Sequence, residues 1–134
     1  MNHCVRPVTI TQVLVSIVIP AFNEEKYLPG TLRAAHKACA VFDQAGWASE
    51  IVVCDNNSTD QTASVARASG VQAVFESFNQ IAASRNAAGN AARGDWLVFV
   101  DADTQVTPML FREMMRAMTR EDCLGGGCPV TFDS

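Results

Sequence analysis

The fold of this protein is decided by one stretch of its sequence, Trp96-Leu97-Val98-Phe99-Val100-Asp101-Ala102-Asp103. Its first five residues are apolar, as expected for a strand that is buried on both faces. Two carboxylates one residue apart follow directly, and Thr107-Pro108 then predicts a helix start, because proline is favoured at the first helical position. Acidic side chains at the end of a buried strand indicate a binding site rather than part of the core.

Apolar runs and helical patterns alternate along the rest of the chain. Strands are predicted at residues 13–20, 50–54, 71–75 and 96–100, and an extended segment begins within residues 124–132. Helices are predicted over residues 27–45, 59–68, 79–92 and 107–120. This order predicts an α/β fold, with a mostly parallel twisted sheet and helices on both of its faces.

Polar side chains that can cap a helix precede each predicted helix. These residues are Asn23, Ser58 or Thr59, Ser77 or Asn79, and Thr107. The acidic pair Glu24-Glu25 is expected at the N-terminus of the first helix, where the helix dipole favours negative charge. This placement would explain both glutamates without a role in binding.

The length and composition fit one globular domain. Within the 134 residues, we assign residues 1–10 to a poorly ordered leader and residues 11–134 to the folded domain. Apolar residues make up 49% and charged residues 18%, which supports a packed core and argues against disorder. The net charge of −4 argues against a nucleic-acid partner, which requires a basic face.

The cysteines favour a reducing compartment. There are five, an odd number, and no pair has the C-x-x-C spacing of a zinc site or a redox motif. The most apolar stretch, residues 8–22, is too short and too polar to span a bilayer, and no signal-peptide pattern precedes it. We therefore expect a cytoplasmic protein without disulfides, zinc or a transmembrane segment, with a peripheral position at the inner face of the membrane as the alternative.

Three polar segments follow predicted strands and are expected to meet. In doubly wound sheets, ligands bind beyond the carboxyl ends of the strands, where the strand order reverses. A strand order of 3-2-1-4 would bring together the ends of the first, second and fourth strands. Those ends carry Pro20-Ala21-Phe22, Asp55 and Asp101-Ala102-Asp103, so we place the candidate site at this edge of the sheet.

Asp101 and Asp103 are candidate metal ligands. Without a cation, a carboxylate about 4 Å from a diphosphate would be repelled by roughly 4 kcal/mol per charge pair at an effective dielectric of about 20. Mg²⁺ or Mn²⁺ reverses this sign, because these ions bind one or two carboxylates together with phosphate oxygens. The alternative is a strand-end turn in which Asp103 is solvated or caps a helix. The neighbouring segments favour the metal, and with it a nucleotide-activated donor.

Asp55 and Arg85 complete the set of candidates. The Asp55 carboxylate can accept a hydrogen bond from a nucleobase, such as uracil N3–H, or from a ribose hydroxyl. The neighbouring Asn57, Ser58 and Asp60 suit turn and helix-cap roles instead. Arg85 can reach a phosphate with its planar guanidinium, and the alternative is a solvated helix arginine.

Other nucleotide sites and metal sites are not favoured. No G-x-G-x-x-G follows the first strand, no G-x-x-x-x-G-K-[ST] is present, and His3 and His36 lack metal-ligand spacing. A sugar-1-phosphate nucleotidyltransferase would also need a metal and a nucleotide. It would require a loop rich in glycine and lysine after the first strand, and residues 20–28 contain Lys26 but no glycine.

The chain resembles the N-terminal part of the family 2 glycosyltransferases, which are inverting enzymes with the GT-A fold. The resemblance is carried by residues 16–25 (SIVIPAFNEE), 51–62 (IVVCDNNSTDQT), 84–89 (SRNAAG) and 94–103 (GDWLVFVDAD). These segments follow the family's order and together cover roughly residues 14–104. The resemblance implies a Rossmann-like GT-A fold that is incomplete at the C-terminus.

The resemblance also implies a role for each candidate residue. The nucleotide-sugar site would consist of Pro20, Ala21, Phe22, Asp55, Arg85 and Asp101, and the metal ligands would be Asp103 and Asp101. The first three of these residues would line the base pocket, Asp55 would bind the base, and Arg85 would face the donor. The implied donor is a UDP- or GDP-linked sugar, and the implied cofactor is Mn²⁺ or Mg²⁺.

The implied reaction is hexosyl transfer from a nucleotide-diphospho-sugar, with inversion and a divalent metal. Family members continue for another ~80–100 residues, which hold the acceptor site and the catalytic base. We therefore expect the base beyond Ser134, a chain truncated before it, and an uncovered sheet edge that favours self-association. The alternative is a non-catalytic nucleotide-sugar-binding or assembly module, and the acceptor is not identified.

Overall fold

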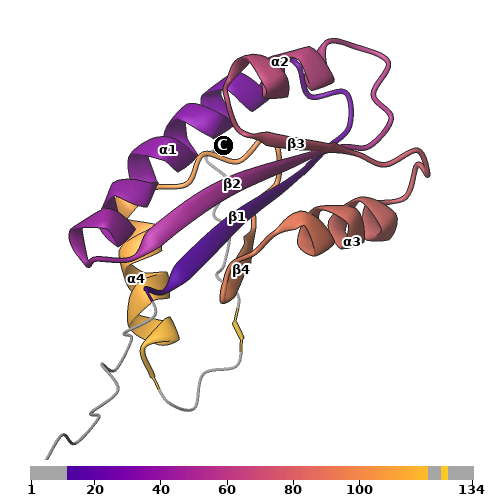
Figure 1. The fold of residues 1–134 in the computed structure, drawn as a ribbon. Helices are drawn as coiled ribbons and strands as arrows, with labels where there is room; N and C mark the ends of the chain where they lie inside the picture. The colour runs from indigo at the N-terminus through magenta and orange to yellow at the C-terminus, as the bar shows by residue number, and fades with distance from the viewer. Residues whose placement is uncertain (1–11, 121–124, 127–134) are drawn as a thin grey trace, which may run out of the picture.

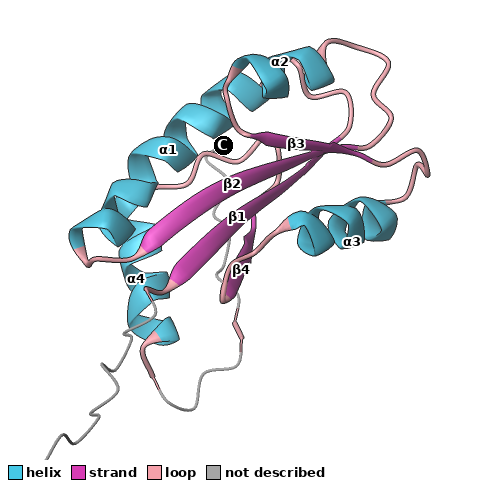
Figure 2. Cartoon of the chain, viewed as in Figure 1, coloured by secondary structure: helices cyan, strands magenta, loops and turns pink. Residues whose placement is uncertain are grey.

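The structure is a computed structural model that describes residues 12–120 and 125–126. Within these residues four strands and four helices alternate, and Figures 1 and 2 show how they are arranged. In chain order the elements are β1 (Leu14–Ala21), α1 (Leu28–Gln44), β2 (Ala48–Asp55), α2 (Thr62–Ala68), β3 (Gln72–Phe75), α3 (Ile81–Ala91), β4 (Trp96–Phe99) and α4 (Pro108–Met118). All predicted strands and helices within the described residues are confirmed, with ends that differ from the predicted ones by at most three residues.

The four strands form one parallel sheet in the order β3-β2-β1-β4, so the predicted order is confirmed. The chain begins in the middle of the sheet at β1, builds outward through β2 and β3, and then crosses to the other side of β1 for β4. Ala21 pairs with Asp55 at the carboxyl end, and Val18 pairs with Phe99. The reversal of strand order at β1 creates the crevice in which such sheets bind ligands.

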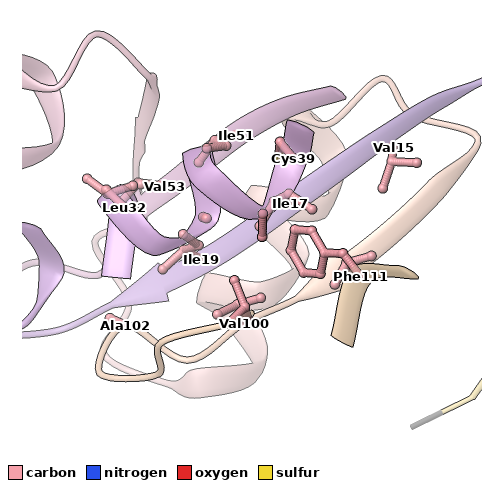
Figure 3. Packing of buried hydrophobic residues seen from close by; sticks show 14 of the residues in the cluster. Val15, Ile17, Ile19, Leu32, Cys39, Ile51, Val53, Val100, Ala102 and Phe111 are labelled. Carbon is pink, nitrogen blue, oxygen red and sulfur yellow. The ribbon is translucent and has the colours of Figure 1, made fainter. Parts of the chain in front are cut away.

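One face of the sheet carries most of the core. The β1 residues Val15, Ile17 and Ile19 are fully buried there against α1 and α4, as Figure 3 shows. The rings of Phe42 on α1 and Phe111 on α4 stack with centroids 5.2 Å apart, which fixes α4 against α1. This face buries 19 hydrophobic residues in one cluster, so it supplies most of the hydrophobic stabilisation.

Among the described helices, α3 is the one that covers the opposite face, as Figure 1 shows. Its core is small and consists of Val18, Cys54 and Ala88. The many alanines of α3 allow the helix to lie close to the sheet, since small side chains permit close backbone approach. The prediction of helices on both faces is therefore confirmed, but the two layers are unequal.

A polar network ties α3 to the amino end of the sheet. Glu50 Oε1 accepts hydrogen bonds from the Ser16 hydroxyl and the Arg93 backbone N–H, each at 2.6 Å. The Gly94 N–H in turn donates to Ser16 Oγ at 2.8 Å. Gly94 lies so close that a Cβ there would be 2.4 Å from Ser16 Oγ and 2.7 Å from Ser16 N. Only glycine fits this approach without a shift of the backbone.

Three of the four predicted helix caps are wrong. The Thr107 side chain accepts from Leu110 N at 3.1 Å, as predicted. The residues at the N-caps of α1, α2 and α3 are Tyr27, Gln61 and Gln80, and none of them makes a side-chain cap bond. Asn23, Ser58, Thr59 and Asn79 instead bond to other loops, because a partner from a distant segment is available to each. The first turn of α1 also holds no acidic residue, so the dipole role predicted for Glu24-Glu25 is wrong.

Two predictions fall on residues that the structure does not describe. These are the leader at residues 1–10 and, apart from Gly125 and Gly126, the extended segment at residues 124–132. Cys39 and Cys54 are buried free thiols, and burial is the largest influence on each and raises the pKa of both. The other cysteines, Cys4, Cys123 and Cys128, lie outside the described residues.

Candidate functional site

The carboxyl ends of β1, β2 and β4 meet at one edge of the sheet, as the strand order requires. At the end of β1, Pro20 is half-buried, Ala21 is buried and Phe22 is 46% exposed. At the end of β2, Asp55 is buried to 6% exposure, and its Oδ1 accepts from Ser58 N at 3.1 Å. The other carboxylate oxygen of Asp55, Oδ2, has no hydrogen-bond partner among the described residues.

Asp101 and Asp103 project away from the core, on either side of a buried alanine. Ala102 is 4% exposed and belongs to the main hydrophobic cluster. Its carbonyl accepts from the hydroxyl of the buried Thr31 on α1 at 2.6 Å, and Asp101 O accepts from Thr104 N at 3.0 Å. The backbone turn is therefore anchored to α1. Both carboxylates are exposed, and no hydrogen bond or ion pair within the described residues holds them.

The loops that follow β1 and β2 are joined side by side. Asn23, in the left-handed region at φ 51°, accepts from Thr59 N through its Oδ1 at 2.8 Å, and Asn23 N donates to Ser58 Oγ at 3.0 Å. Glu24 N donates to Thr62 Oγ1 at 2.9 Å. These bonds explain the Asn, Ser and Thr residues of the two loops structurally. They also hold Glu24 at the site.

Asp60 stabilises the start of α2. Its Oδ1 accepts from Thr62 N at 2.9 Å, and its Oδ2 accepts from Glu25 N at 3.3 Å. Desolvation acts to raise the pKa of Asp60, but hydrogen bonds from the hydroxyl and amide of Thr62 and from the Glu25 amide outweigh it and lower the pKa. Asp60 is not the N-cap residue of α2, but its carboxylate satisfies the first N–H of the helix and joins it to the loop after β1.

Glu24 is a site residue that the sequence analysis missed. Burial raises the pKa of its carboxyl, and the negative charges of Asp103, Asp60 and Asp101 raise it further. The negative charges of Asp103, Asp60 and Asp101 therefore act on the Glu24 carboxyl at the carboxyl edge. Within the described residues no ion pair to Glu24, Asp101 or Asp103 is present, and a bound divalent ion would offset this negative charge. No sequence signal separated Glu24 from an ordinary helix-start glutamate.

The acidic group fits a weakly held cation better than a closed metal cage. Among the described residues, no three side chains of His, Cys, Asp or Glu are arranged closely enough to bind a metal by themselves. Mg²⁺ and Mn²⁺ commonly use only one or two carboxylates and complete their shells with phosphate oxygens and water. Two exposed, unpaired carboxylates match that requirement.

A small pocket lies beside Asp55, between α2 and β3. It has a volume of about 190 Å³ and is lined by Asp55, Ala63, Arg67, Ala73, Val74 and Phe75. The pocket combines a carboxylate acceptor, a guanidinium donor and an aromatic side chain, which suits a planar polar ring. Arg67 was not predicted, because only the packing of α2 on β3 brings it to Asp55.

Arg85 lies on the other face of the sheet. Its guanidinium carbon is 4.6 Å from the centroid of the Phe99 ring, at the end of β4 and two residues before Asp101. The structure therefore brings Arg85 to the β4 end and not into the pocket beside Asp55. The arginine is exposed and makes a cation–π contact there.

The sequence matches the profile described as glycosyl transferase family 2 over residues 16–134. The chain belongs to glycosyl transferase family 2. This match includes all three strand ends of the candidate site, and it confirms the resemblance stated above.

Curated members of glycosyl transferase family 2 include similar proteins. The undecaprenyl-phosphate 4-deoxy-4-formamido-L-arabinose transferase of Pseudomonas aeruginosa (strain LESB58) is 39% identical over 102 residues, which cover 71% of this chain and 29% of that protein. The enzyme of the same name from Klebsiella pneumoniae is 35% identical over 115 residues, 81% of this chain and 33% of the relative. The chain thus spans about a third of the length of these relatives.

Solved structures share the GT-A fold. Glucosyl-3-phosphoglycerate synthase from Mycobacterium tuberculosis, in complex with Mn²⁺, UDP and glucosyl-3-phosphoglycerate, superposes with a TM-score of 0.67 at 26% identity and covers 81% of this chain and 41% of its own. TarS 1–349 from S. aureus in complex with UDP has a TM-score of 0.62 at 23% identity and covers 79% of this chain and 32% of its own, which shows the fold alone. The fold prediction is confirmed.

Within residues 12–120 and 125–126 of this family 2 member, no helix has both the length and the apolar character needed to span a bilayer.

Proposed function

We propose that this chain binds a nucleotide-diphospho-sugar and a divalent cation, as the donor half of an inverting hexosyltransferase. The carrying observation is the pair of Asp101 and Asp103 carboxylates, which are exposed, have no partner among the described residues, and flank Ala102, whose carbonyl is anchored by Thr31. Negative charge concentrated without a partner is destabilising, so its retention is best explained by a ligand that is positive. Family membership supports the same interpretation.

The donor would lie along the three strand ends. We assign the base to Asp55, whose second carboxylate oxygen is free, with Pro20, Ala21 and Phe22 as the wall of the base pocket. UDP is the favoured nucleotide, because solved relatives contain UDP and because one free oxygen suits the single N3–H of uracil. Arg85, at the β4 end, would contribute charge toward the donor diphosphate.

Asp103 and Asp101 would hold Mn²⁺ or Mg²⁺, with Glu24 close enough to influence the charge of the site. Such an ion, when bound, supplies positive charge for the departing nucleoside diphosphate. The chain's own contribution is positional: Thr31 fixes the turn between the two aspartates, and the joined loops fix Glu24. A single displacement at the anomeric carbon inverts its configuration, and we place the base that deprotonates the acceptor outside the described residues.

We further propose that the acceptor carries a phosphate on a lipid. The curated relatives are named for transfer to undecaprenyl phosphate, and the identity to this chain reaches 39% over the donor half. Acceptor identity is tested by supplying polyprenyl phosphate or 3-phosphoglycerate with a UDP-sugar and following sugar transfer. Transfer to 3-phosphoglycerate alone would overturn the lipid assignment.

A non-catalytic nucleotide-sugar-binding or assembly module is the second candidate. The two candidates differ in turnover: the first predicts hydrolysis or transfer of the bound donor, and the second predicts binding alone. Mass spectrometry of products after prolonged incubation with UDP-sugars separates them.

The edge strand β4 supports a proposal of self-association. In the sheet as described, β4 lies at the edge, and its Leu97 and Phe99 side chains are 41% and 39% exposed. Unpaired strand edges with apolar side chains pair readily with other chains. Light scattering should show a mass above that of one chain at high concentration, and Leu97→Lys should restore the monomer. A monomeric wild-type chain would contradict the proposal.

The metal and donor assignments are tested together by thermal shift. UDP at about 100 times Kd should stabilise the protein by roughly 2.7 kcal/mol when MnCl₂ is present. Asp103→Asn should abolish the manganese-dependent part, whereas Asp43→Asn, an exposed aspartate on α1, should leave it unchanged. If the shift survives in Asp103→Asn, Asp103 is not a metal ligand. If GDP gives the larger shift, the UDP assignment is wrong.

A further inference from the structure

Three large apolar side chains are exposed within seven residues around the β3–α3 connection. Phe75, Phe78 and Ile81 are 61%, 57% and 76% exposed, and together they form what we call the β3–α3 patch. This connection projects from the carboxyl edge of the sheet, at the right-hand end of the molecule in Figure 1. Adjacent exposed apolar side chains at one place commonly mark an interaction surface.

The patch is held in position by hydrogen bonds. Asn57 Nδ2 donates to Asn79 Oδ1 at 3.0 Å and to Ser77 O at 3.5 Å, and Asn56 Nδ2 donates to Gln80 O at 3.4 Å. Glu76 N donates to Asp55 O at 3.0 Å. These bonds tie the connection to the end of β2, so the apolar side chains are presented outward by a fixed backbone.

Positive charge flanks the patch, although the whole chain carries a net charge of −4. Arg67 lines the same pocket as Phe75, and Arg85 lies one helical turn after Ile81 on the same side of α3. The acidic side chain of the connection, Glu76, is half-buried and accepts from Phe78 N at 3.1 Å. Apolar side chains flanked by arginines are complementary to an apolar surface that carries negative charge.

We propose that the β3–α3 patch is the surface with which this protein rests on a bilayer that contains anionic headgroups. This inference rests on one part of the proposed function, namely that the acceptor is a lipid phosphate. Such an acceptor is confined to the membrane, so the carboxyl edge of the sheet, where the donor site lies, must face the bilayer. Phe75, Phe78 and Ile81 enter the headgroup region, and Arg67 and Arg85 contact lipid phosphates.

The size of the patch favours a bilayer over a protein partner. Three such side chains bury at most about 750 Å² together, since large aromatic side chains bury about 150–250 Å² each. A stable protein interface needs about 800 Å² from each partner. A bilayer accepts a few apolar side chains without further shape complementarity, and the binding strengthens with apolar area and with anionic lipid.

Vesicle flotation tests the proposal with the whole chain. Vesicles of phosphatidylcholine mixed with phosphatidylglycerol should carry the protein upward in a density gradient, and pure phosphatidylcholine should carry less. The double variant Phe78→Ser/Ile81→Ser should bind about tenfold more weakly, because binding scales with buried apolar area. Met109→Ser is the matched control: Met109 is 69% exposed on α4, and its loss should not change flotation. Urea unfolding of each variant checks that the fold is retained.

Measuring the thermal shift with UDP and manganese on the same samples separates the patch proposal from the donor proposal. Wild-type protein that does not float, or a double variant that floats equally well, overturns the patch proposal even if UDP binds. Flotation that depends on Phe78 and Ile81 supports the patch, even where UDP gives no shift and the donor proposal fails. A double variant that loses the UDP shift but still floats assigns these side chains to the donor and overturns the patch.

Discussion

Glu50 and Glu24 are both partly buried carboxylates, at opposite ends of the same sheet, and their surroundings shift their pKa values in opposite directions. At the amino end, desolvation acts to raise the pKa of Glu50, but hydrogen bonds from Arg93 N and Ser16 and the charge of Arg93 outweigh it and lower the pKa. At the carboxyl end, burial and three neighbouring acids raise the pKa of Glu24. The Glu50 carboxylate has hydrogen-bond donors and a cation within the chain, whereas the part of the chain that the structure describes supplies neither to the Glu24 carboxylate.

The difference separates structural charge from charge held for a ligand. Glu50 binds α3 to the sheet, and its Oε2 lies 3.6 Å from the Arg93 guanidinium. Glu24 feels the negative charges of Asp101 and Asp103, and the backbone of these loops is anchored by other residues, Thr31 and Thr62. Under the proposed function, a bound cation would offset this negative charge.

The largest effect is expected at Gly94, in the amino-end network. Gly94→Ala would place a Cβ within 2.4 Å of Ser16 Oγ and 2.7 Å of Ser16 N, so the backbone must shift and the Glu50 network must open. We expect a loss of about 3 kcal/mol of unfolding free energy. Gly89→Ala is the control, since its Cβ would lie 3.8 Å from Phe99 and alanine favours the helix. Equal urea midpoints for the two variants would refute the close-approach argument.

Glu50→Gln should cost about 2 kcal/mol at neutral pH, because charged hydrogen bonds from Arg93 N and Ser16 become neutral ones. The folded pKa of Glu50 lies below the ordinary value of 4.5, so its stabilisation is present above that pH and is lost as pH falls through the folded value. The variant should lack this acid-dependent loss. Urea unfolding from neutral pH down to below 4.5 measures it, and parallel curves would contradict the prediction.

Thr31→Val tests the anchor of the two aspartates. The variant removes the hydroxyl that donates to Ala102 O and leaves this buried carbonyl without its partner, at a cost of about 1.5 kcal/mol. Manganese-dependent stabilisation by UDP should fall as well, because the Asp101–Asp103 turn loses its position. Thr119→Val, at an exposed hydroxyl that bonds to Arg116 O, should change neither quantity. A reduced unfolding free energy with an intact manganese response would show that the anchor does not position the site.

Glu24→Gln should have the smallest effect and the opposite sign to Glu50→Gln. The pKa of Glu24 in the folded protein is raised above 4.5, so the unfolding free energy of the wild type falls as pH rises from 4.5 through the folded pKa. The variant has no carboxyl at this position and does not lose this free energy. We expect a gain of about 0.5 kcal/mol at neutral pH and none under acid conditions. Urea unfolding without and with MnCl₂ checks it, since the cation should remove the variant's advantage. A destabilised variant would mean that Glu24 has an unrecognised partner.

The strand order and the position of the site could be predicted from short segments. Each strand was visible as an apolar run, and parallel strands with alternating helices leave few topologies. Asp55, Asp101 and Asp103 could be placed at one edge because each follows a strand directly. The Thr107 cap was also predictable, since its acceptor serves an N–H only three residues away.

Interactions between distant segments could not be predicted in the same way. Asn23 was predicted to cap α1, but its Oδ1 instead accepts a hydrogen bond from the N–H of Thr59, 36 residues away. Glu24 looked like a helix-start glutamate, yet its pKa depends on acids from two other loops. Arg67 reaches the Asp55 pocket only because α2 packs on β3. In each case a local propensity of about 1 kcal/mol competes with tertiary bonds of similar size, so sequence proximity does not decide the outcome.

The sequence by itself determined the alternation of strands and helices and the acidic strand ends, because periodicity and position along the chain are local properties. It limited the strand order to a few topologies, of which the structure has β3-β2-β1-β4. Only the tertiary structure decided which carboxylates are neutralised and which are not. Glu50 accepts a hydrogen bond from the N–H of Arg93, 43 residues away, whereas Glu24 is influenced by the negative charges of Asp101 and Asp103. The physical reason is that a charge responds to everything within a few ångströms, whatever the separation along the chain.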